Sequence, residues 1–88
     1  MQKRFQVVKA RGYTFILKYD AAAPDILHIF ARHLTGIPDV LDVFFNHTSK
    51  MWNEDHDRFE TFTKTHGLYW FWRDEKKKVV VVITCFTI

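Results

Sequence analysis

Two histidines and an arginine, His28, Arg32 and His33, stand close together in an otherwise apolar stretch, residues 27–36. If this stretch is a helix, His28 and Arg32 lie one turn apart on one face, about 6 Å from each other, and can share one phosphate group. The helix turns His33 away from His28, and His33 is then better placed to close the helix, where a cation favours the C-terminal dipole. The spacing therefore indicates His28 with Arg32 as a pair suited to acid–base chemistry.

The residues present give little support to other kinds of chemistry. The single cysteine, Cys85, lies in an apolar segment where burial would raise its pKa and leave it unreactive. The sequence has no glycine-rich phosphate loop, and its helical histidines lack the spacing of a metal-ligand pair. We therefore predict no metal and no cofactor. Metal-independent acid–base chemistry on a phosphodiester remains, and RNA supplies its own nucleophile for it, the 2′-hydroxyl.

The composition predicts one folded domain over residues 1–88. The chain is 48% hydrophobic and 17% aromatic, which suits one core and argues against disorder. Residues 1–20 and 58–88 have a net positive charge and residues 21–57 a net negative one. A sheet built from both ends would attract phosphates, although ordinary solvated charge is the other interpretation. The single cysteine, and the lack of a signal-like or membrane-spanning apolar run, lead us to expect a soluble cytoplasmic protein with no membrane partner.

The first half of the chain predicts a hairpin and then a helix that carries the histidines. Residues 4–9 and 13–19 are rich in β-branched and aromatic side chains, and Gly12 between them suits a positive φ. Residues 24–35 begin with a proline and are followed by Gly36. A proline in the first turn and a glycine cap after the last turn are typical of a helix. A strand stays open as the alternative for this stretch, because its composition also suits one.

The second half predicts another helix and then a sheet. Apolar residues recur at helical spacing after Pro38, and residues 46–57 read as a loop with a short edge strand at 49–52. Three strand-like segments follow, residues 58–65, 68–74 and 78–86. The predicted fold is therefore α+β, with an N-terminal β-hairpin, two short helices, and then a three-stranded antiparallel meander forming one sheet. Its last strand, rich in valine, is expected to be central and covered on both faces.

A two-residue turn at residues 66–67 would fix which side chains share a face of this meander. It pairs Phe62 with Phe71 and Glu60 with Arg73. One face then carries cations and a phenol that can bind phosphate or move a proton, or that only form solvent-exposed pairs: Arg58, Lys64, Tyr69 and Arg73. The other face carries Trp70 and Trp72, which either fill the core or stack nucleic-acid bases.

Several of these segments together resemble a known protein family. The stretch FARHLTGIPDVLDVFF, followed by DRFETF, a hairpin and VVVVITCF, resembles the BrnT/RelE-like ribonuclease toxins of the barnase–EndoU–colicin–RelE superfamily over residues 27–87. The resemblance implies a metal-independent endoribonuclease that a cognate antitoxin or immunity protein neutralises. The positions carried over are His28, Arg32, His33 and Arg58. The chain departs from that pattern in its N-terminal hairpin and in a last strand that ends without arginine.

These observations lead to one prediction and two alternatives. We predict a ribonuclease toxin with catalytic residues His28, Arg32, Arg58 and Tyr69 and substrate-binding residues Lys64, Arg73 and His33. The first alternative is a non-catalytic RNA- or protein-binding module, phage- or plasmid-borne, that uses the basic sheet face. The second is a homodimer, indicated by Trp52 in a polar loop.

Overall fold

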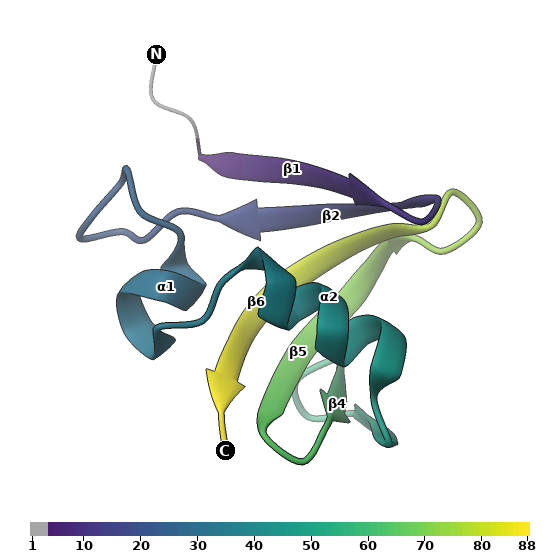
Figure 1. Ribbon diagram of the computed structural model, residues 1–88. Helices are drawn as coiled ribbons and strands as arrows, with labels where there is room; N and C mark the ends of the chain where they lie inside the picture. The colour runs from purple at the N-terminus through teal and green to yellow at the C-terminus, as the bar shows by residue number, and fades with distance from the viewer. Residues whose placement is uncertain (1–3) are drawn as a thin grey trace.

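Six strands form one mixed sheet, and two short helices lie on one of its faces (Figure 1). The computed structural model describes residues 4–88; residues 1–3, the start of the predicted domain, lie outside the described residues. In chain order the elements are β1 (Phe5–Ala10), β2 (Tyr13–Lys18), α1 (His28–His33), α2 (Ile37–Asn46), β3 (Ser49–Asn53), β4 (Arg58–Phe62), β5 (His66–Asp74) and β6 (Val79–Thr87). The strand order is β1-β2-β6-β5-β4-β3, and all neighbours are antiparallel except β2 and β6, which are parallel.

The predicted fold class, with a three-stranded meander as the sheet, is wrong. About half of the residues are in strands, and the sheet includes the N-terminal hairpin and the edge strand β3 as well as the three meander strands. The physical reason lies in β6, whose backbone needs hydrogen-bonding partners along both edges. Strand β5 pairs with one edge and β2 with the other. The two ends of the chain therefore meet in the middle of one sheet.

Strands β1 and β2 form the hairpin predicted for this stretch. Ala10 pairs with Tyr13, so the turn consists of Arg11 and Gly12, whose φ values are 51° and 81°. Two positive φ values give the turn a twist that matches that of antiparallel strands. A Cβ at Gly12 would meet nothing within 4 Å. Glycine is therefore favoured here by its backbone freedom and not by lack of space.

The first helix is shorter than predicted. It spans only His28–His33, and the segment before it is a loop in which Pro24 does not begin a helix. Leu27 makes an isolated bridge to Tyr19, which ties the end of the loop back to the sheet. The side chain of Asp20 fixes the start of the loop by accepting hydrogen bonds from two backbone N–H groups, at 3.0 and 3.1 Å. This turn competes with the helix that the sequence pattern predicts.

The joint between the helices also differs from the prediction. Leu34, with a left-handed φ of 55°, caps the end of α1. Gly36 caps the start of α2 instead of the end of α1. The Gly36 N–H donates to the Asp39 carboxylate at 2.8 Å. Thr35, between the helices, is buried, and its hydroxyl lies 2.8 Å from the carbonyl oxygen of Cys85 in β6. This contact holds the joint against the sheet.

The hydrophobic core lies between the helices and one face of the sheet. Trp70 is 1% exposed, and its ring meets that of Phe44 in α2 edge-on at 5.0 Å. Trp72 packs beside it, half-buried. The core-filling interpretation is therefore confirmed for Trp70, whereas Trp72 packs against the core and keeps part of its ring exposed. The other buried apolar residues are Phe15, Leu17, Ile29, Val40, Val43, Leu68, Val80, Val82 and Cys85.

Within residues 4–88, no helix lies over the opposite face of the sheet (Figure 1). Strand β6 is central, as predicted, but the expectation that both its faces are covered is wrong. Val80 and Val82 are buried, whereas Val79 and Val81 are only half-buried. Both helices lie on the same side of the sheet, so alternate valines remain on the uncovered face.

The predicted register between β4 and β5 is wrong by four residues. Phe62 pairs with Gly67 and not with Phe71, and Glu60 pairs with Tyr69 and not with Arg73. Gly67 belongs to the strand because the Phe86 ring packs over it: a Cβ there would lie 2.5 Å from Phe86 Cζ. Because the shift is an even number of residues, each side chain keeps the face that the sequence predicts.

Candidate nucleic-acid interface

The predicted site residues lie in two separate groups. His28, Arg32 and His33 belong to α1 and lie on the helix-covered side. Arg58 and Tyr69 alternate with Phe59 and Trp70, which pack in the core, so they project from the uncovered face. Arg73 is exposed at a bulge in β5, and Lys64 is exposed in the turn before β5. The structure therefore does not assemble His28 and Arg58 around one phosphate.

His28 and Arg32 share a buried carboxylate, that of Asp20. Arg32 Nε donates to Asp20 Oδ1 at 2.8 Å, and His28 Nδ1 lies 3.5 Å from the same oxygen. Burial raises the pKa of the Asp20 carboxyl, but the hydrogen bonds from Arg32 and from two backbone amides outweigh burial and leave the pKa below its ordinary value. Asp20 is therefore ionised at neutral pH and compensates the charge of Arg32.

The environment of His28 favours the neutral imidazole. Burial lowers its pKa, and the positive charge of Lys18 lowers it further; the nearby Asp20 carboxylate opposes both effects without cancelling them. The ring of His33 lies 5.9 Å from that of His28, so the expectation that the helix turns these rings apart is wrong. His28 is the first residue of α1 and His33 is its last.

Arg58 is also paired, in this case on the uncovered face. Its Nε donates to Glu60 Oε2 at 2.8 Å, and its guanidinium lies 4.0 Å from the centre of the Tyr69 ring. The hydrogen bond from Asn53, together with Arg58, lowers the pKa of Glu60 in spite of its burial. Arg58 is therefore compensated, and the predicted pair of Glu60 with Arg73 does not form.

The uncovered face carries an apolar row that the sequence does not reveal. Val7 pairs with Ile16, Ile16 with Val81, and Val81 with Phe71, so the row crosses four neighbouring strands. Both ends of the row are open to solvent, with Val7 56% and Phe71 36% exposed. Lys9 and Lys18 lie on the same face in β1 and β2, because they alternate with residues that pack in the core. Neither lysine forms an ion pair with any of residues 4–88.

The apolar row was missed because it depends on a pairing between the two ends of the chain. The only signal was the alternation in β1, where Val7 and Lys9 fall on one side of the strand. Such alternation cannot tell which strand lies beside β2. The parallel pairing of β2 with β6 supplies the missing information.

The structure also bears on the expectations for Cys85, for metal binding, for membrane-spanning helices and for Trp52. Cys85 is buried and its burial raises its pKa to about 11, as the sequence predicts; its low reactivity stays a prediction. Within residues 4–88, no three His, Cys, Asp or Glu side chains gather closely enough to hold a metal ion. None of the helices in that range has the length and apolar character needed to cross a bilayer. Trp52 lies in β3, which confirms the short edge strand expected at residues 49–52, and the homodimer that Trp52 suggested stays a prediction.

Comparison of the chain with protein-family models, curated proteins and solved structures finds no match. The resemblance to ribonuclease toxins therefore stays a prediction from the sequence. A function can be inferred only from the residues of the site and their arrangement.

Proposed function

We propose that the uncovered face of the sheet binds single-stranded RNA. The observation that supports this best is the apolar row, open to solvent and ending in Phe71, with Lys9 and Lys18 on the same face. The exposed Phe71 ring gives a base a surface for stacking, worth roughly 1–3 kcal/mol, and the lysines attract phosphates of the same strand. The function that follows is a binding module without catalysis at this face.

The charges favour RNA over a protein partner. Lys9 and Lys18 stand free of ion pairs within residues 4–88, while the carboxylate of Glu60 on the same face is already taken by Arg58. Exposed Arg73 adds another cation at the β5 bulge near Phe71. Lys9, Lys18 and Arg73 outnumber Asp74, the further carboxylate at the end of this face beside Val79, so the net charge of the face is positive and suits a phosphate backbone. The cytoplasm is the proposed location, because RNA is present there and the single thiol stays reduced.

Binding of a labelled oligouridine over a salt series tests this proposal. Lys9→Gln combined with Lys18→Gln should reduce the slope of log affinity against log salt by about 1.4, since each phosphate contact on a single strand contributes about 0.7. Phe71→Ala should weaken binding by about fivefold or more through lost stacking. The matched control is Lys76→Gln with Lys77→Gln, in the loop between β5 and β6. A salt-independent affinity, or equal effects of the two double variants, would refute the proposal.

RNA cleavage at His28 is a second candidate, supported by a separate observation. The imidazole favours its neutral form and lies 3.5 Å from a buried carboxylate that can orient it, as a general base requires. The Arg32 side chain is 54% exposed, so part of its guanidinium can still reach a phosphate. If His28 acts in this way, the family resemblance implies a cognate antitoxin or immunity protein as partner.

Expression in bacteria separates cleavage from binding alone. The wild type should slow growth and degrade RNA, His28→Ala should abolish both effects, and His56→Ala, in an exposed turn, should leave them unchanged. Equal growth and intact RNA for wild type and His28→Ala would remove the cleavage candidate. The RNA-binding proposal would be unaffected, because His28 is not on the uncovered face.

A further inference from the structure

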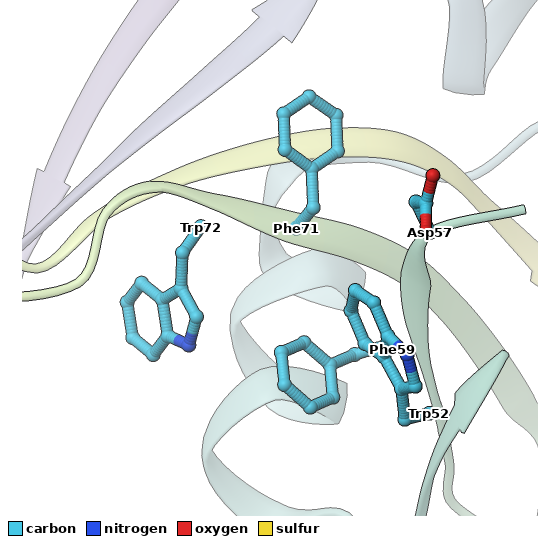
Figure 2. A pocket seen from close by; sticks show the side chains of 5 residues that line it. All are labelled: Trp52, Asp57, Phe59, Phe71 and Trp72. Carbon is cyan, nitrogen blue, oxygen red and sulfur yellow. The ribbon is translucent and has the colours of Figure 1, made fainter. Parts of the chain in front are cut away.

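An open aromatic hollow lies at the edge of β5, beside the point where β4 begins (Figure 2). Its volume is about 530 Å³, and it is lined by four aromatic residues and one carboxylate: Trp52, Asp57, Phe59, Phe71 and Trp72. Figure 2 shows Trp72 and Phe59 on one side of β5 and Phe71 on the other. The hollow is thus rich in ring surface and has a single charged group in its wall.

The strand lengths explain why the hollow is there. The pairing of β4 with β5 extends as far as Phe59 opposite Trp70, and β4 begins one residue earlier, at Arg58. Strand β5 continues to Asp74, so its last residues extend past β4. The edge strand β3 contributes Trp52, which meets Phe59 at 4.8 Å between ring centres and is 47% exposed. A small ligand can therefore reach the rings without any movement of the sheet.

The rings of this region already attract an ammonium group. The Nζ atom of Lys50 lies 4.6 Å from the centre of the Phe59 ring and 5.5 Å from that of Trp70. These distances are within the range of a cation–π interaction, in which the negative face of the ring attracts the cation. Lys50 is not part of the wall of the hollow, so the surfaces of Trp52 and Trp72 remain available to a second cation.

The charges around the hollow distinguish a cation from a nucleotide. Asp57 belongs to an exposed turn that also carries Glu54 and Asp55. Among residues 4–88, none of these three carboxylates forms an ion pair. A nucleotide could stack on the rings, but the turn would repel its phosphate. An organic cation is attracted both by the rings and by the turn, and these attractions act against repulsion from the Lys50 ammonium, 4.6 Å from the centre of the Phe59 ring.

We propose that this hollow binds a methylated ammonium ion, a small free cation of the choline type. The methyl groups spread the positive charge over an apolar surface that can contact several rings, and Asp57 supplies the counter-charge. The inference does not rest on RNA binding: Phe71 belongs both to the apolar row and to the wall of the hollow, but Trp52 and Asp57 belong to the hollow alone.

Titration of the intact protein with choline, followed by the NMR signals of the three tryptophan indole N–H groups, tests the proposal. The signals of Trp52 and Trp72 should shift and saturate, and that of buried Trp70 should move least. The neutral analogue 3,3-dimethylbutan-1-ol has the same shape without the charge and should bind at least about fivefold more weakly. Equal affinities for the two probes would overturn the proposal, as would shifts that never saturate.

Matched variants locate the site. Asp57→Asn should weaken choline binding about two- to fivefold, and asparagine tolerates the left-handed φ of 50° at this position. Asp55→Asn removes the same charge from the same turn but outside the wall, and should have less than half that effect. Trp52→Leu should abolish the saturable shift of Trp72 while leaving the thermal unfolding temperature nearly unchanged. If AMP shifts these signals and competes with choline, the hollow is a base-stacking site and the proposal fails.

Discussion

Replacement of Thr35 by valine should loosen the joint between α1 and the sheet. Thr35 is 1% exposed, and its hydroxyl lies 2.8 Å from the carbonyl oxygen of Cys85 and 3.1 Å from that of Ile29. Valine has nearly the same shape, so the change removes the hydroxyl without opening a cavity. The perturbation therefore isolates the one proton that this buried hydroxyl can donate, with the Cys85 carbonyl as its nearer acceptor.

The expected magnitude follows from burial. A hydrogen bond contributes about 1 kcal/mol net, and leaving a buried acceptor without its partner raises the loss to about 1–3 kcal/mol. For a domain of this size each kcal/mol corresponds to about 4–8 °C, so the unfolding temperature should fall by roughly 5–20 °C. The loss should appear first at α1, because this helix depends on Thr35 for its attachment to β6.

Urea unfolding together with amide hydrogen exchange measures both effects. Thr35→Val should lower the unfolding free energy and speed exchange at the α1 amides more than at those of β5. Thr87→Val, at the exposed end of β6, is the control and should stay within about 0.5 kcal/mol of the wild type. A Thr35→Val protein as stable as the wild type would show that the hydroxyl does not hold the joint.

Three further predictions concern stability and reactivity. Gly67→Ala should destabilise the protein by about 1–3 kcal/mol in urea unfolding, because the new Cβ would lie 2.5 Å from Phe86 Cζ and the ring must move; unchanged stability would show that the ring moves freely. The lowered pKa of Asp20 contributes stability above its unfolded pKa of 3.8 that is lost as the pH falls through the lower folded value. Asp20→Asn should therefore flatten the acid limb of an unfolding-temperature curve, and an unaltered limb would contradict this. Cys85 should resist iodoacetamide at pH 8 in the folded protein and react in urea, since burial raises its pKa to about 11; rapid labelling of the folded protein would be inconsistent with that burial.

Local patterns predicted the parts of the fold that depend on neighbouring residues. The turn at Gly12 and the apolar spacing of α2 each need only a few adjacent positions. The faces of β4 and β5 could also be predicted although their register was wrong, because alternation along one strand does not depend on its partner. The shift of four residues came from reading Gly67 as a turn residue, when its role is to leave room for a ring from β6.

The site was harder to predict because its charged side chains pair with residues that are distant in the sequence. Asp20 lies outside the predicted helix, and nothing in its local sequence shows that Arg32 will turn back to it. Glu60, by contrast, lies two residues from Arg58 on the same face of one strand. Strand periodicity alone could have predicted the pair of Arg58 with Glu60, but the assumed register paired Glu60 with Arg73 instead.

The parallel pairing of β2 with β6 has a consequence for how the chain folds. Thr14 lies beside Val79, so this pairing must close a loop that runs from residue 14 to residue 79, at an entropic cost greater than that of the short turns between the antiparallel strands. Strands β3 to β6 can form their antiparallel contacts from local turns before that closure. We expect the N-terminal hairpin to join the sheet last. During synthesis, β2 can pair with β6 only after β6 has left the ribosome.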